Sequence, residues 1–129
     1  MAIVISRSET QLSATTSFQA MDNLGASSVS SSFVIPSNVS SVKQITISVC
    51  ADGSEEFVPL VQLSGNSMRD GSAVFAGKGL SAFTTSTGAT SNSITYDTNL
   101  AIVSGNSMEI GLAVTDAATI SAVVTLQLA

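Results

Sequence analysis

The stretch Val42-Lys43-Gln44-Ile45-Thr46-Ile47-Ser48-Val49 alternates apolar and polar side chains with a period of two. Because successive side chains of an extended strand point to opposite faces, the apolar residues at 45, 47 and 49 share one face. The polar residues between them share the other face. Val, Ile and Thr favour strands of this kind. The stretch therefore predicts a β-strand with one buried face.

Two further stretches, Met108–Thr115 and Ile120–Leu128, show the same alternation. Their apolar faces and that of the first stretch must be covered, so we expect the three to contribute to one core. The residues expected in this core are Ile45, Ile47, Val49, Ile110, Leu112, Val114, Val124 and Leu126. The residues expected to point outward are Thr46, Ser48, Ala113, Thr115, Ser121 and Thr125.

The rest of the chain contains further short apolar runs, separated by clusters of Gly, Asn, Asp, Ser and Pro that favour turns. The strands expected there are Ala2–Ser6, Ser13–Ala20, Ser31–Ile35, Phe57–Leu63, Ala73–Ala76 and Ile94–Val103. The last could be two short strands or one strand with a bulge. Any helix should be a single turn near Val39–Val42. Short strands joined by turns predict an all-β fold, a sandwich or a barrel, with residues 1–129 forming a single domain.

One segment of the sequence is repeated. Leu60–Val74 and Leu100–Val114 both contain Ser-Gly-Asn-Ser-Met, at an offset of 40 residues. The two copies could form equivalent strand–turn–strand corners. Alternatively, the same turn chemistry has been selected twice. The repeat does not occur a third time, which excludes a solenoid or a propeller.

Charge is scarce in this chain. It has 4 Lys and Arg against 9 Asp and Glu, a net charge of −5 and 44% hydrophobic residues. The hydrophobic content excludes disorder of the highly charged kind. The cations Arg7, Lys43, Arg69 and Lys78 are scattered singly, whereas nucleic-acid binding needs a basic patch. We therefore expect no direct contact with nucleic acid.

No segment approaches the ~20 apolar residues of a membrane-spanning helix, and the apolar opening Met1–Ile5 is too short for a signal peptide. We therefore expect no membrane insertion. We expect the chain to be made in the cytoplasm of a host cell, the alternative being a secreted fragment without its signal. Cys50, the single cysteine, should then be a reduced thiol.

The sequence predicts no catalytic, cofactor-binding or metal-binding residues, and hence not an enzyme. It contains no His, which is the commonest general base and metal ligand, and one cysteine cannot form a thiolate cluster. The acidic cluster Asp52, Glu55 and Glu56 lacks the pattern of a calcium loop and is interpreted as a solvated loop. Ser40–Lys43 and Gly77–Gly79 lack the companion motifs of a Ser–Lys dyad and a phosphate loop.

Small polar side chains dominate the chain, with 24 Ser and 13 Thr. An exterior built from small neutral residues suits contact with other protein surfaces, because little charge has to be desolvated. The runs Ser27–Ser32 and Thr84–Ser93 are interpreted as loops or edge strands that lie against a neighbouring subunit. Composition therefore favours a protein that assembles.

Three segments, Phe33–Val49, Val61–Gly71 and Ser121–Ala129, resemble segments of small jelly-roll virion proteins of viruses and phages. The resemblance covers about a third of the chain. It implies a capsid or capsid-decoration protein made of two packed antiparallel sheets, a jelly roll of about eight strands. The basic arm of many genome-contacting coat proteins is missing, which favours a decoration subunit or a coat laid over a membrane or another shell.

The expected function is therefore that of a virion structural protein that acts by symmetric self-assembly, as a trimer or a larger closed ring. Its expected partners are other copies of itself and a larger capsid shell, with no cofactor. The alternative is a receptor- or glycan-binding module of a surface assembly. Tyr96, Asp97 and Asn99 form the cluster that could contact a sugar. A glycan array would discriminate between these two hypotheses.

Overall fold

A computed structural model describes residues 3–21, 32–51, 59–64, 73–76, 90–116 and 118–129, and all structural statements concern these residues. They form nine strands and no helix, so no described helix could cross a membrane. The strands are β1 (Ile3–Ala14), β2 (Gln19–Ala20), β3 (Ser32–Val34), β4 (Ser41–Ala51), β5 (Pro59–Ser64), β6 (Ala73–Ala76), β7 (Thr90–Ala101), β8 (Ser107–Val114) and β9 (Ala118–Leu128).

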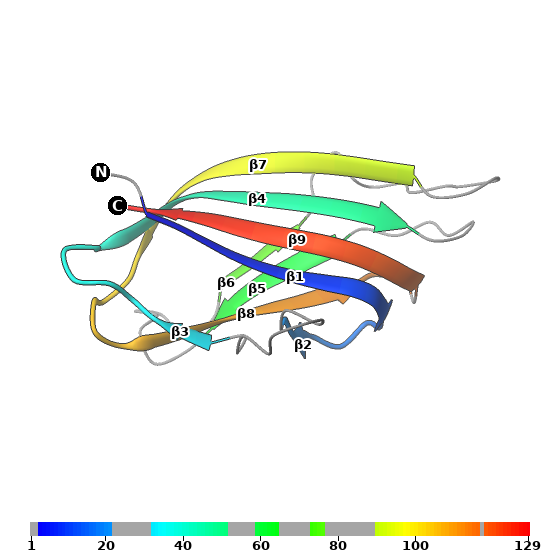
Figure 1. The fold of residues 1–129 in the computed structure, drawn as a ribbon, viewed down its shortest axis with the longest axis horizontal. Coiled ribbons are helices and arrows are strands. Elements are labelled where there is room, and N and C mark those ends of the chain that lie inside the picture. The colour runs from blue at the N-terminus through cyan, green and yellow to red at the C-terminus, as the bar shows by residue number, and fades with distance from the viewer. Residues whose placement is uncertain (1–2, 22–31, 52–58, 65–72, 77–89, 117) are drawn as a thin grey trace.

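The strands form two antiparallel sheets packed face to face (Figure 1). Sheet A has the order β1-β9-β4-β7, and sheet B has the order β2-β8-β5-β6 with β3 also paired to β8. Strands β2 and β3 lie end to end along β8, since Ala20 is opposite Gly111 and Ser32 is opposite Glu109. Counted as one interrupted strand, they leave eight strands in the order of a jelly roll, 1-8-3-6 and 2-7-4-5.

The predicted all-β antiparallel sandwich is therefore confirmed, but two local predictions are wrong. The N-terminal part was expected as two strands, Ala2–Ser6 and Ser13–Ala20. Instead β1 pairs with β9 along nearly its whole length and continues to Ala14 through an irregularity between Glu9 and Leu12. The expected helical turn near Val39–Val42 is replaced by a strand that starts at Ser41.

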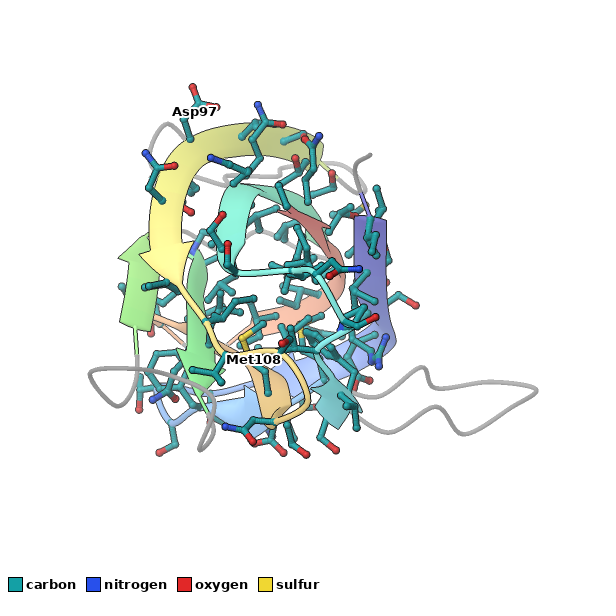
Figure 2. All side chains as sticks on the ribbon, turned by 90° about the vertical axis from the view of Figure 1, so that its left-hand side faces the viewer. Asp97 and Met108 are labelled. Carbon is teal, nitrogen blue, oxygen red and sulfur yellow. The ribbon has the colours of Figure 1, made fainter. Side chains whose placement is uncertain are left out.

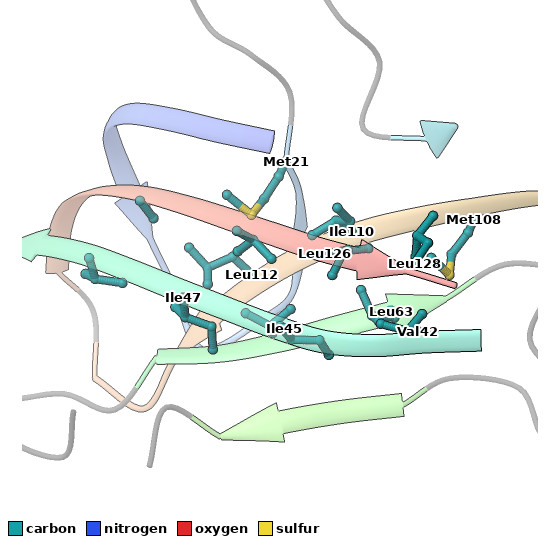
Figure 3. Packing of buried hydrophobic residues seen from close by; sticks show 14 of the residues in the cluster. Met21, Val42, Ile45, Ile47, Leu63, Met108, Ile110, Leu112, Leu126 and Leu128 are labelled. Atoms are coloured by element: carbon teal, nitrogen blue, oxygen red, sulfur yellow. The ribbon is translucent and has the colours of Figure 1, made fainter. Parts of the chain in front are cut away.

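The core lies between the two sheets (Figure 3). Sheet A contributes alternate residues of β4 and β9, and sheet B contributes alternate residues of β8 and β5. All eight residues predicted for the core are at most 2% exposed, which confirms the prediction. Leu112 is fully buried in this layer.

The prediction that Ala113 points outward to solvent is wrong, because Ala113 is fully buried. It lies on the outer face of β8, opposite Leu60 of β5. On the other side of β8 lies the segment that follows β1, since the amide of Val114 donates to the carbonyl of Thr15 at 2.9 Å. A methyl group in the middle of a sheet is small enough to be covered by such neighbours.

The two copies of the repeated segment occupy different topological places. The first begins in β5 and ends in β6, and these two strands pair with each other in sheet B. The second begins in β7 of sheet A and ends in β8 of sheet B, so it connects the two layers. The interpretation as equivalent corners is therefore wrong. The second copy bends at Gly105, whose φ of 86° suits glycine.

Candidate functional site

On the outer face of sheet A the described side chains form a regular pattern. Their inward neighbours are core residues, so the alternation leaves small polar side chains outside. Among the described side chains of this face, Lys43 and Asp97 are the two that carry a charge. The face is formed by Val4, Ser6, Ser8, Lys43, Gln44, Thr46, Ser48, Ser93, Thr95, Asp97, Asn99, Ser121, Val123, Thr125 and Gln127.

Hydroxyl groups form rows across this face. The strand register places Ser6, Thr125, Thr46 and Thr95 directly opposite one another, one from each strand. The hydroxyls of Ser6 and Thr125 are 2.8 Å apart, and those of Thr46 and Thr95 are 2.9 Å apart. In the next row the hydroxyl of Ser48 donates to that of a β7 serine, Ser93, at 3.0 Å. These hydroxyls therefore bond to each other within the sheet.

The two charges lie together where β4 meets β7. The register between these strands shifts between Val42 and Gln44, which places Lys43 and Gln44 both toward the outside. The amide nitrogen of Gln44 donates to a carboxylate oxygen of Asp97 at 2.9 Å. The ammonium of Lys43 donates to the side-chain oxygen of Asn99 at 3.4 Å. Opposite charges at one corner leave the rest of the described face neutral.

The structure does not assemble the predicted sugar-contacting cluster of Tyr96, Asp97 and Asn99. Asp97 and Asn99 are exposed on the outer face, and Asp97 points away from the ribbon in Figure 2. Tyr96 is half-buried and packs against the core from the other side of the strand. Consecutive residues of a strand point to opposite faces, so one ligand cannot stack on Tyr96 while it bonds to Asp97. This part of the prediction is wrong.

Two charged residues that sequence reasoning did not single out lie inside the sandwich. Arg7 and Glu9 are 8% and 4% exposed and follow Ile3 and Ile5 on the inward face of β1. The guanidinium of Arg7 donates to the carbonyl of Ser6 at 2.8 Å. The period of two that begins at Ile3 would have placed both charges on the inward face.

Arg7 also connects the two sheets. It donates to the carbonyl of Ser32 in β3 at 3.4 Å, and its guanidinium carbon lies 5.5 Å from the centre of the Phe33 ring. A guanidinium over an aromatic face at this distance is a favourable cation–π contact. Arg7 therefore joins β1 of sheet A to β3 of sheet B, rather than serving as a surface cation.

Within the described ranges, no group of three or more His, Cys, Asp or Glu is placed where it could hold a metal ion. Cys50 is half-buried and forms no disulfide bond. The acidic cluster Asp52, Glu55 and Glu56, the Gly77–Gly79 segment and most of the two Ser- and Thr-rich runs lie outside the described residues. The structure therefore does not test what was predicted for them.

Comparison with known proteins yields similarities of fold. No family model and no curated protein matches the sequence. The globular domain of zebrafish complement 1qA is 15% identical, with 96% of this chain and 93% of that chain covered and a TM-score of 0.46. A carbohydrate-binding module of glycoside hydrolase family 9 (Cel9A) from Ruminococcus flavefaciens is 14% identical, with 96% and 98% covered and a TM-score of 0.48.

A third similar structure is the T13 viral particle of IBDV. It is 11% identical, with a TM-score of 0.40, and the match covers 98% of this chain but 31% of that chain. All three neighbours have β-sandwich folds of the jelly-roll kind. At these identities and TM-scores the likeness concerns the fold alone.

Proposed function

We propose that this chain is a virion structural protein, a capsid or capsid-decoration subunit that assembles symmetrically with other copies on a larger viral shell. The observation that supports the proposal is the outer face of sheet A. Its described side chains include two charges, which lie together at one corner, and its hydroxyls bond to one another. The proposed role requires no catalytic step, no cofactor and no contact with nucleic acid.

The hydrogen-bonded rows make this face suitable for burial against another protein. A hydroxyl buried without a partner costs about 1–3 kcal/mol, which makes most polar faces expensive to cover. Here Thr46, Thr95, Ser6 and Thr125 keep their mutual hydrogen bonds when water is removed. The cost of desolvating the centre of the face is correspondingly small.

The dimensions of the face also suit a specific contact. Four strands spaced ~4.8 Å apart, with ~3.3 Å per residue along each strand, give an area of about 600 Å² per copy. Two such surfaces together exceed the ~1,000 Å² that a specific interface needs. Val4 and Val123, which are 60% and 40% exposed on this face, would add apolar burial.

The test places like charges at the centre of the face. Thr46→Glu and Thr125→Glu should each weaken self-association at least about tenfold, because a contact through this face would then bury or oppose the added carboxylates. Multi-angle light scattering over a range of concentrations, at low and high salt, measures the association of each variant. The wild-type association should change little with salt, since few charges take part.

Thr115→Glu is the matched control, because Thr115 is exposed just beyond the end of β8 and does not lie on sheet A. Its association should equal that of the wild type. Circular dichroism confirms that all three variants keep a β spectrum. A wild-type chain that stays monomeric at both salt concentrations, or equal association of all variants, would contradict the proposal.

A further inference from the structure

Sheet A has two margins, and the strand β1 that forms one of them is protected against pairing with another chain. Charged residues that point inward from an edge strand, and irregularities in its pairing, both oppose the addition of a further strand. β1 carries the inward-facing Arg7 and Glu9, followed by an irregularity between Glu9 and Leu12. The hydrogen bond from Arg7 to Ser32 also ties this margin to sheet B.

The strand β7 at the opposite margin carries no inward-facing charge, and its pairing with β4 is regular from Thr90 to Asp97, the register shift lying beyond Asp97. It runs over 12 residues, Thr90–Ala101, without Pro, Gly, Lys or Arg. Its one charge, Asp97, points outward and accepts a hydrogen bond from Gln44. Of the described strands, β4 alone pairs with β7. A long edge strand with a regular stretch that carries no inward-facing charge is a template for pairing with another strand.

We infer that β7 pairs antiparallel with β7 of a second copy of this chain, which joins two four-stranded sheets into one continuous sheet. The inference rests on the proposed function and names one contact of that assembly. A two-fold axis makes the contact isologous, so that each copy contributes the same strand. An antiparallel ladder of 12 residues forms about ten backbone hydrogen bonds, as many as a typical protein interface contains.

The side chains of β7 are complementary to themselves when the axis passes beside Thr95. Thr95 then lies opposite the same residue of the second copy, a Thr–Thr pair like the one it already forms with Thr46 at 2.9 Å. Ser93 and Asp97 are equally far from Thr95, so each carboxylate lies opposite a hydroxyl of the other copy. An axis beside Asp97 would oppose two carboxylates, which is unfavourable.

This self-complementarity favours a second copy over an unrelated strand. The outer face continues across the junction as well, because the hydroxyl rows of both copies lie in one sheet. Ser93, Thr95 and Asp97 are all exposed, so their side chains are accessible from the outside.

Disulfide trapping tests the contact directly. In a Cys50→Ser background, Thr95→Cys would bring two thiols face to face, since opposite residues of a strand pair have Cβ atoms ~4.5–5.5 Å apart. We expect the covalent dimer to form about tenfold faster, or more, than from random collisions, because pairing raises the effective thiol concentration toward the millimolar range. Non-reducing electrophoresis at fixed protein and oxidant concentrations measures the rate.

Thr115→Cys in the same background is the control, because Thr115 is exposed just beyond the end of β8 and does not lie on sheet A. A mixture of Ser93→Cys and Asp97→Cys chains, which should form the mixed dimer faster than either forms its own, provides a second pair. Equal rates for Thr95→Cys and Thr115→Cys, or no preference for the mixed dimer, would overturn the inference. Light scattering of the wild type distinguishes this failure from failure of the proposed function. If only the β7 contact is wrong, the wild type still associates through another contact; if the proposed function is wrong, it stays monomeric.

Discussion

Replacing Leu112 by alanine should lower the free energy of unfolding by about 2–5 kcal/mol. Leu112 is 0% exposed to solvent and belongs to the core cluster, which contains residues of both sheets. Truncation removes buried apolar surface and leaves a cavity that two sheets held by backbone hydrogen bonds cannot close. Urea denaturation followed by circular dichroism measures the change.

Val103→Ala is the control for the core prediction, because Val103 is 48% exposed. Its effect should stay within about 0.5 kcal/mol, as for most surface substitutions. A loss below about 1 kcal/mol for Leu112→Ala would mean that the two sheets do not share the tightly packed core described above.

Replacing Arg7 by alanine should lower the free energy of unfolding by about 2–4 kcal/mol. The substitution removes two hydrogen bonds from a guanidinium, to the carbonyls of Ser6 and Ser32, and the contact with the Phe33 ring. It also leaves the buried Glu9 without a nearby inward-facing cation on β1. Thermal and urea unfolding measure the loss.

Lys43→Ala is the matched control, since Lys43 is an exposed cation on the same sheet whose ammonium lies 3.4 Å from the Asn99 oxygen. Its removal should change stability by less than about 0.5 kcal/mol. Similar effects of the two substitutions would show that Arg7 does not join the sheets in solution.

The alternation of apolar and polar residues with a period of two predicted much of the fold from the sequence. It assigned the inward faces of β4, β8 and β9 correctly, because a strand with one buried face must alternate and a shift by one residue would expose every apolar side chain. It did not predict which residues lie side by side across strands. Ser6 and Thr125, which are 119 positions apart in the sequence, share a row only because β1 pairs with β9.

The site predictions failed where a local pattern was not enough. Tyr96 and Asp97 are neighbours in sequence, but the strand sends them to opposite faces. Ala113 follows the outward period, yet it is fully buried on the outer face of β8. Arg7 is one of several cations scattered singly in the sequence, but its place after Ile3 and Ile5 puts it on the inward face.

Quantitative mass spectrometry of gradient-purified virus particles from the source of this sequence tests the central claim most directly. A structural subunit is present in every particle, and its copy number follows the symmetry of the shell. The account predicts that this chain co-sediments with the particles at a fixed, high copy number relative to the other shell proteins. Absence from the purified particles, or a trace amount that varies between preparations, would contradict it.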